Sequence, residues 1–318
     1  MTEHFVTLFD EAFLPLGLAM YATLLEHAQP FKLWVVCMDD GCLAALRRLA
    51  LLHVIPIPLA EVEAEHPQLI GVRPGRSRGE YCWTATPFTF DTVFHRDVTA
   101  KRVTYLDADM GFNRSPHVLL DELTASGKGV LITEHGFAPE HATKAGTCGR
   151  FCVQFLTVGR DAESRIVTTW WQDRCIEWCF AREEPERFGD QKYLDAWPRL
   201  FGDAVHILAD SRLTLAPWNV HHVLAQEEPI ARHVVFHFHD MRMASRKRVR
   251  LSWGYHIGQR ASPIYTAHMK RLAEACRTIE DAGLPVRWPG VPACSTTHDR
   301  GRYLWRWLRG RVAWATLP

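Results

Sequence analysis

The chain has 318 residues, and 47% of its side chains are hydrophobic, which is enough to form a large buried core. Charged residues make up 23% and the formal net charge is +1, so the composition excludes a disordered polyelectrolyte and argues against a protein that coats nucleic acid. No apolar run approaches the ~20 residues of a membrane-spanning helix, and the first residues do not resemble a signal peptide. We therefore expect a soluble, cytoplasmic protein.

Strand and helix patterns alternate along the first 110 residues. Strands are predicted at residues 4–10, 31–38, 54–59 and 102–106, and helices at 16–27, 42–52 and 84–95. Short, continuously apolar strands separated by helices are typical of a parallel sheet that is covered on both faces. Such sheets bind ligands beyond the carboxyl ends of their strands, so chemistry is expected just after a strand.

Charge is distributed unevenly along the chain. Residues 1–240 carry 22 Lys and Arg against 32 Asp and Glu, whereas residues 241–318 carry 15 against 4, which gives net charges of −10 and +11. This asymmetry predicts a catalytic or binding domain over 1–240 and a basic extension, rich in Trp and Arg, over 241–318. Within the extension, residues 267–282 have a helical pattern.

The strongest local signal follows the strand at 102–106, where Asp107 and Asp109 stand one residue apart. Two carboxylates at this spacing on an extended chain point to the same side, and their repulsion is costly unless a cation lies beside them. Hard divalent ions such as Mn²⁺ or Mg²⁺ bind such oxygens, and nucleotide phosphates complete their coordination. The alternative is a solvated loop that carries two acids.

Two further patterns occur downstream. Gly189 followed by Asp190 and Gln191 is typical of a helix start, in which Asp190 is either the N-cap or a group beside a reacting centre. His237 and His239 share one face of a predicted strand, where they are either metal ligands or a structural pair.

The chain has nine cysteines, four of which form two closely spaced pairs. One pair is Cys148 with Cys152, and the other is Cys175 with Cys179 in a predicted helix over 166–182. Four cysteines can bind structural zinc, but the usual pairs are separated by two residues. We therefore favour buried free thiols.

Taken in this order, the patterns resemble those of GT-A-type glycosyltransferases, in particular the nucleotide-diphospho-sugar transferase family that includes glycogenin and the lipopolysaccharide galactosyl- and glucosyltransferases. The resemblance covers residues 4–240 and lies in four places: the acid that ends the first strand (Asp10), the Asp-x-Asp motif (Asp107 and Asp109), the Asp-Gln pair (Asp190 and Gln191) and the histidine after a late apolar strand (His237).

The resemblance implies an α/β protein with a Rossmann-like, mixed and mainly parallel sheet, followed by a basic helical extension. It implies a metal-dependent hexosyltransferase that moves a sugar from a nucleotide-diphosphate sugar, here a UDP-sugar, to a glycan or lipid-linked acceptor with retention of configuration. Residues 1–110 would be the nucleotide-binding half of the domain and residues 111–240 the acceptor half.

The resemblance also implies roles for single residues. Mn²⁺ or Mg²⁺ would be bound by Asp107, Asp109 and His237. Asp190 and Gln191 would be catalytic. The nucleotide would contact Thr7, Phe9, Asp10 and Asp107, and the sugar or acceptor would contact Gln154, Trp218 and Asn219. For Trp218, core packing is the alternative to a stacking face for a sugar.

The chain departs from the family pattern in two places. The family's Asn-x-Gly corresponds here to Cys152, Val153 and Gln154, and its phosphate-binding Lys after the histidine is missing, with Arg242 as a replacement. Two other functions remain open. They are a haloacid-dehalogenase-type phosphohydrolase using Asp107 and Asp109, and a non-enzymatic, zinc-stabilised binding module.

The extension ends in residues 302–314, where aromatic side chains alternate with arginines. An amphipathic segment of this kind can lie on an anionic membrane, with Trp in the interface and Arg at the headgroups. This predicts a peripheral contact with the inner face of the membrane. Alternatively, the segment folds back onto the acidic domain over 1–240 and its positive charge neutralises the negative charge of that domain.

Overall fold

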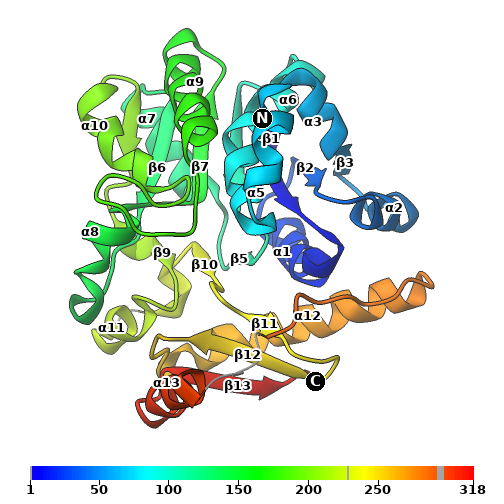
Figure 1. Cartoon of the computed structure of the whole chain (residues 1–318), viewed down its shortest axis with the longest axis vertical. Coiled ribbons are helices and arrows are strands. Elements are labelled where there is room, and N and C mark those ends of the chain that lie inside the picture. The colour runs from blue at the N-terminus through cyan, green and yellow to red at the C-terminus, as the bar shows by residue number, and fades with distance from the viewer. Residues whose placement is uncertain (1, 228, 292–296) are drawn as a thin grey trace.

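The structure is a computed structural model that describes residues 2–227, 229–291 and 297–318. Its centre is a seven-stranded mixed sheet with the strand order β3-β2-β1-β4-β7-β6-β8 (Figure 1). Neighbouring strands are parallel except that β7 runs antiparallel to both β4 and β6. The seven strands are β1 (Glu3–Phe9), β2 (Phe31–Cys37), β3 (Val54–Pro58), β4 (Arg102–Leu106), β6 (Val130–Glu134), β7 (Phe151–Gly159) and β8 (Val205–Ile207).

The first four predicted strands are thus confirmed, as is the mainly parallel sheet. Helices cover both faces of the sheet (Figure 1). The α-helices are α1 (Leu14–His27), α2 (Asp40–Leu49), α3 (Leu59–Glu65), α4 (Gln68–Val72), α5 (Arg78–Ala85), α6 (Thr89–Arg96), α7 (His117–Ser126), α8 (Lys144–Cys148), α9 (Ala162–Glu177), α10 (Trp197–Leu200), α11 (Val220–Ala225), α12 (Ser262–Asp281) and α13 (Thr297–Leu308). Within the described part of the chain, no helix has the length and apolar character that crossing a bilayer requires.

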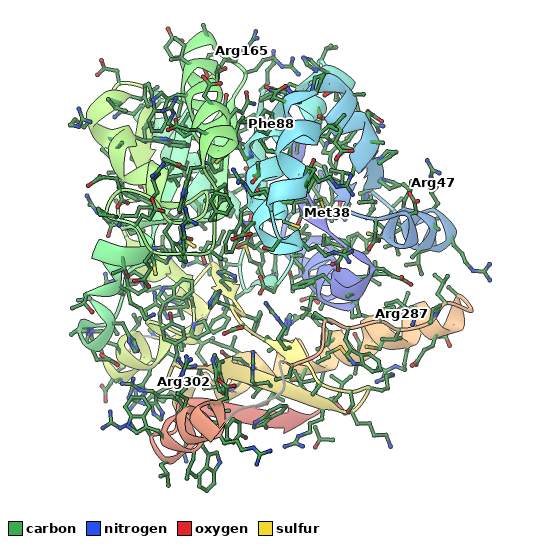
Figure 2. The ribbon with its side chains drawn as sticks, viewed as in Figure 1. Met38, Arg47, Phe88, Arg165, Arg287 and Arg302 are labelled. Atoms are coloured by element: carbon green, nitrogen blue, oxygen red, sulfur yellow. The ribbon has the colours of Figure 1, made fainter. Side chains whose placement is uncertain are left out.

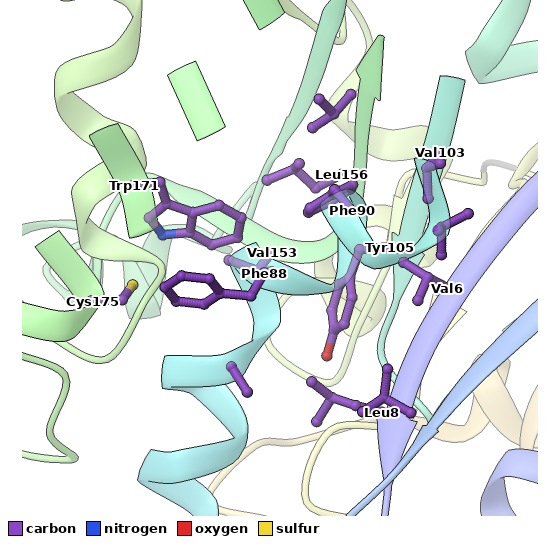
Figure 3. Close-up of a cluster of buried hydrophobic side chains, with 14 of the residues drawn as sticks. Val6, Leu8, Phe88, Phe90, Val103, Tyr105, Val153, Leu156, Trp171 and Cys175 are labelled. Atoms are coloured by element: carbon purple, nitrogen blue, oxygen red, sulfur yellow. The ribbon is translucent and has the colours of Figure 1, made fainter. Parts of the chain in front are cut away.

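The core has one layer on each side of the sheet because successive side chains of a strand point to opposite faces. On one face, Val6, Val103 and Tyr105 pack against Phe90 of α6 and Trp171 of α9 (Figure 3). On the other face, side chains of β1 and β2 pack against α1 and the carboxyl-terminal end of α12. Phe88 and Met38 are buried in this interior, whereas Arg47 and Arg165 project into solvent (Figure 2).

Two predicted helices have different bounds in the structure. The helix predicted at 84–95 is two helices, α5 and α6, joined by a 3₁₀ turn at Thr86–Phe88. Pro87 lies in this turn, and proline cannot donate the hydrogen bond that a continuous helix would need. The helix predicted at 166–182 is α9, which Asp161 caps by accepting from the Ser164 amide and which ends at Glu177.

Two small sheets lie below the central sheet in Figure 1. One has the order β5-β10-β9, and in it His237 of β10 pairs with Met110 of β5. The other has the antiparallel order β11-β12-β13. Their strands are β5 (Met110–Phe112), β9 (Thr214–Leu215), β10 (Val235–His237), β11 (Arg242–Met243), β12 (Arg248–Trp253) and β13 (Val312–Thr316).

The basic extension shares a hydrophobic core with the rest of the protein. Met269 and Leu272 of α12 belong to the same buried cluster as Leu16 and Ala19 of α1. An ion pair of 2.7 Å between the Arg271 guanidinium and the Glu26 carboxylate joins the same two helices. The division of the chain at residue 240 stays a prediction.

Residues 302–314 do not form one continuous amphipathic segment. They include the end of α13 and the start of β13, which pairs with β12. The two parts contact each other because the Trp314 indole N–H donates to the Tyr303 hydroxyl at 3.1 Å. Four large hydrophobic side chains of α13 remain exposed, namely Leu304, Trp305, Trp307 and Leu308.

Candidate functional site

Three of the predicted ligand residues meet at the carboxyl edge of the central sheet. Asp107 and Asp109 follow β4, and His237 is the last residue of β10. The His237 Nε2 atom lies 3.1 Å from Asp109 Oδ1 and 3.6 Å from Asp107 Oδ2. Within the described ranges this is the one group of three or more potential metal ligands, and its ligand atoms all lie within 4.8 Å of one another.

Backbone hydrogen bonds fix this arrangement. The Phe238 amide donates to the carbonyl of Asp109 at 2.7 Å, which ties the end of β10 to the Asp-x-Asp loop. The Asp107 amide donates to the Gln154 carbonyl of β7 at 3.2 Å. The two acids and the histidine are therefore held by three different strands, although His237 is far from both acids in the sequence.

The hydrogen bonds of His237 leave one nitrogen facing the acids. Its Nδ1 lies 2.8 Å from the side-chain carbonyl of Gln154, and the Nδ1–H donates to that oxygen. In the neutral ring, Nε2 then carries a lone pair that faces the Asp109 oxygen. Two acceptors at 3.1 Å need a proton or a cation between them.

The pKa values show the same demand for positive charge. Burial lowers the pKa of His237, but the charges of Asp109 and Asp107, together with hydrogen bonds to Asp109 and Cys152, outweigh burial and raise the net pKa well above its usual value. Burial raises the pKa of Asp109, and His237 brings the net value well below the usual range. Burial raises the pKa of Asp107 to about 6, with the charge of His237 opposing the rise and that of Asp109 adding to it.

The three residues fit a divalent cation. Two carboxylates and one imidazole supply the oxygen and nitrogen ligands that Mn²⁺ accepts. Mg²⁺ prefers oxygen ligands, which the two carboxylates supply. Gln154 orients the ring by accepting from its other nitrogen, as the outer partners of metal-bound histidines do. Tyr105 adds a second support, since its hydroxyl donates to Asp107 Oδ1 at 3.1 Å.

Asp190 lies beside this group but is not a helix cap. The helical turn after it begins at Lys192 and has no side-chain cap, so the predicted N-cap role is wrong. The Asp190 side chain is buried, and burial, with the charge of Asp107 added, raises its pKa well above the usual value. The side-chain amide of Gln191 donates to the Cys148 carbonyl at 2.9 Å, which holds it against the end of α8.

The residues expected to contact the nucleotide lie at the end of β1. Asp10 accepts from the Phe13 amide at 3.0 Å and forms an ion pair of 2.7 Å with Arg78, a residue that the sequence reasoning missed. Thr7 is buried, and its hydroxyl has no hydrogen-bond partner among the described residues. The Phe9 ring packs so closely against α1 that a Cβ at Gly17 would lie 2.7 Å from it.

The remaining predicted contacts lie around His237. Trp218 is buried, makes an edge-to-face contact with His237 at a centroid distance of 5.5 Å, and donates to the His135 carbonyl at 2.6 Å. Asn219 is buried in the same loop, where its side chain accepts from the Ala216 amide at 2.8 Å. Gln154 is also buried, with its side chain engaged by His237 rather than open to solvent. The sugar contacts of these residues stay predictions.

The four paired cysteines do not form one cluster in the structure. Cys175 and Cys179 are both buried, and burial together with Cys179 raises the pKa of Cys175 well above its usual value. Cys148 and Cys152 lie in α8 and β7, and the group of possible metal ligands found in the described residues contains no cysteine. The structure thus gives no support to a zinc-stabilised module.

The chain is similar to known proteins in sequence and in fold. No model of a known protein family matches the chain. The uncharacterized protein YfnD of Bacillus subtilis (strain 168) is 28% identical over 295 residues, a match that covers 88% of this chain and 92% of YfnD. Mouse xyloside xylosyltransferase 1, in its apo form, aligns with a TM-score of 0.50 and 14% identity over 76% of this chain and 98% of the mouse chain.

A second solved structure has the same fold. The apo structure of the bifunctional glycosyltransferase WbbM aligns with a TM-score of 0.50 and 13% identity, over 88% of this chain and 51% of the WbbM chain. At these identities the likeness shows the fold. The GT-A-type fold predicted from the sequence is therefore confirmed.

Proposed function

We propose that this protein is a metal-dependent glycosyltransferase that moves a sugar from a nucleotide-diphosphate sugar to a glycan acceptor. The observation that carries the proposal is the meeting of Asp107, Asp109 and His237 at the carboxyl edge of a GT-A-type sheet. Glycosyltransferases named in the two solved structures share this fold. The expected donor is a UDP-sugar and the expected ion is Mn²⁺ or Mg²⁺.

The side chains of the site divide the chemistry among them. A divalent ion bound by Asp107, Asp109 and His237 would neutralise the donor's diphosphate and stabilise it as it leaves. The sugar becomes oxocarbenium-like as that bond breaks, and the buried Asp190, in its ionised form, would stabilise the positive charge. Retention of configuration is part of the proposal, with the departing phosphate taking the proton of the acceptor.

Binding of UDP in the presence of Mn²⁺ tests this function directly. We expect UDP with Mn²⁺ to raise the melting temperature of the wild-type protein, because a ligand that binds only the native state stabilises it. The matched control is Asp109→Asn, which keeps the shape of the side chain and removes its charge, and which should abolish the Mn²⁺-dependent part of the shift. A wild-type protein that hydrolyses phosphate esters but does not bind UDP with Mn²⁺ would instead favour the phosphohydrolase.

The lipid-linked acceptor and the membrane contact belong to the same proposal. They are supported by α13, which exposes Leu304, Trp305, Trp307 and Leu308 in a basic part of the chain. We expect the protein to sediment with vesicles that contain phosphatidylglycerol and not with pure phosphatidylcholine vesicles. The double substitution Trp307→Ser with Leu308→Ser should abolish this. Absence of wild-type binding to both vesicles would contradict the membrane contact, and a location at the cytoplasmic face stays a prediction.

A further inference from the structure

A pocket of about 330 Å³ lies between the metal triad and the basic extension. Lys144 of α8 and His239, in the loop after β10, line one part of its wall. Trp253 and Tyr255, at and after the end of β12, line another, together with Arg306 of α13 and Arg311 in the turn that follows α13. The ring of His239 lies 5.4 Å from that of His237, so one wall of the pocket directly adjoins a ligand of the triad.

Aromatic rings form a large part of the pocket wall. The Tyr255 ring makes an edge-to-face contact with the His141 ring at a centroid distance of 5.0 Å. The Lys144 ammonium lies 5.4 Å from the centroid of the same Tyr255 ring. On the neighbouring wall, the Arg306 guanidinium lies 4.5 Å from the centre of the Trp253 ring. Aromatic faces with a few convergent polar groups are typical of ligand pockets, and they suit the apolar face of a sugar ring.

The pocket also has an excess of positive charge. Arg306, Arg311 and Lys144 contribute three cations, whereas the single acid in the lining, Asp240, has its Oδ1 atom 3.3 Å from Arg250 Nη2. The Arg306 Nη1 atom is buried and has no hydrogen-bond partner among the residues that the structure describes. A guanidinium that is partly removed from water and incompletely bonded favours an anionic group, since carboxylate and phosphate match its geometry.

The position of the pocket separates it from the nucleotide end of the site. Asp10, the expected nucleoside contact, directly follows β1, which is labelled near the middle of Figure 1, whereas α8 and α13 lie on the left. The triad stands between them because Asp107 and Asp109 follow β4, next to β1, and His237 adjoins the pocket wall. A sugar transferred at the triad would therefore meet a second substrate that enters from the pocket.

We propose that this pocket is the acceptor subsite and that it binds a saccharide carrying a carboxylate or a phosphate. The sugar ring lies against Tyr255, and the anionic group pairs with Arg306. The proposal rests on the proposed function, and it assigns to the basic extension a part in choosing the acceptor.

Calorimetric titration of the full-length protein, without metal or donor, tests the pocket by itself. The probes are methyl glucoside, methyl glucuronide and glucose 6-phosphate, which differ in charge and in the source of that charge. We expect at least one anionic probe to bind about tenfold more tightly than methyl glucoside, as expected for a hydrogen bond to a charged group. Whether the glucuronide or the phosphate binds more tightly identifies the anionic group of the acceptor.

Three variants tie the preference to Arg306. Arg306→Gln should remove the tenfold preference and Arg306→Lys should keep part of it, because a point charge remains. Arg248→Gln is the matched control, since Arg248 stacks on Trp314 and neither residue lines the pocket, and it should bind all probes as the wild type does. Equal binding of charged and neutral probes by the wild type, or an unchanged preference in Arg306→Gln, would overturn the proposal.

A titration with UDP and Mn²⁺ separates this proposal from the proposed function. If Arg306→Gln weakens the binding of UDP, Arg306 contacts the donor's diphosphate and the acceptor assignment is wrong. If the wild type does not bind UDP at all, the proposed function fails, while the preference for anionic saccharides is decided by the first titration alone.

Discussion

The imidazole of His237 is held from both sides, by Gln154 at Nδ1 and by the two acids at Nε2. The sugar contact of Gln154 stays a prediction, and the hydrogen bond that its buried side chain accepts orients the ring. We predict that Gln154→Leu lowers the affinity for Mn²⁺ about 10- to 100-fold, the usual effect of removing the outer partner of a ligand histidine. Titration with Mn²⁺ measures this, and Gln154→Glu, which keeps an acceptor oxygen, should restore most of the affinity. An unchanged affinity in the leucine variant would show that Gln154 does not orient the ligand.

The two neighbouring histidines should respond differently to substitution. Nε2 of His237 faces both carboxylates, whereas burial, with the charge of His237 next, lowers the pKa of His239 to about 4 and keeps it neutral. We predict that His237→Ala weakens Mn²⁺ binding far more than His239→Ala does. The same Mn²⁺ titration compares the two variants, and the opposite ranking would move the ligand assignment by two residues.

At the scale of single elements, apolar patterning predicted the strands well because both faces of the sheet are buried. Helix ends were harder to predict. Pro87 divides one predicted helix, and α9 ends before Trp178, whose backbone is extended and not helical. The Gly189-Asp190 pattern resembled a helix start, but tertiary contacts around Asp190 place the first helical residue at Lys192. Helix ends that depend on tertiary contacts cannot be predicted from the local sequence.

Helix α12 carries a buried base that links stability to pH. His268 is 1% exposed and stacks on Phe238 at a centroid distance of 3.6 Å, and neither ring nitrogen has a hydrogen-bond partner within the described ranges. Burial lowers its pKa to about 3. The unfolded chain takes up this proton near pH 6.5 and the folded protein only near pH 3, so the free energy of unfolding falls as the pH decreases between these values.

We therefore predict that His268→Leu reduces this acid sensitivity. Between pH 6.5 and 5, the wild type should lose up to ~1.4 kcal/mol per pH unit more than the variant, since one fewer proton is bound by the native state. Urea unfolding of both proteins across this range measures the difference, and the other titrating groups cancel in the comparison. If the unfolding free energies of the two proteins fell in parallel as the pH decreased, His268 would be protonated in the native state as well.

At the scale of the whole molecule, the sequence located the two acids and the family resemblance added His237, but neither predicted that Gln154 would orient the histidine ring. Asp107 and Asp109 follow an apolar strand and form a local motif, whereas the partners of His237 lie in distant segments. Arg78 and the pocket residue Tyr255 carry no local signal of function, and the pattern that contains Arg306 predicted a membrane contact and not a pocket. The positions of Tyr255 and Arg306 depend on how the basic extension packs, and local residue patterns do not predict that packing.

The packing of the extension predicts the result of truncation. Removal of the residues after Gly290 takes away β13, the partner of β12, together with the buried side chains of Val312 and Leu317. We expect the unfolding free energy to fall by about 3–6 kcal/mol, at ~1.5–3 kcal/mol for each buried side chain. Thermal or urea unfolding measures the loss. Trp307→Ala, which removes a side chain that is 55% exposed, is the control and should change stability by less than ~0.5 kcal/mol.

An unchanged melting temperature after truncation would contradict this prediction. It would also mean that the hydrophobic surface of α12 against α1 is sufficient to hold the extension in place.

The pairing of β5 with β10 has a consequence for the newly made chain. Asp107 and Asp109 leave the ribosome more than a hundred residues before His237, and β5, the strand that follows them, has no partner in its small sheet until β10 is synthesised. During that interval the chain carries two acids without the nitrogen that completes their set. The three proposed ligands are thus present together only after residue 237 has been synthesised, so binding of an ion by all three would mark a nascent chain in which β4 and β10 have both been made.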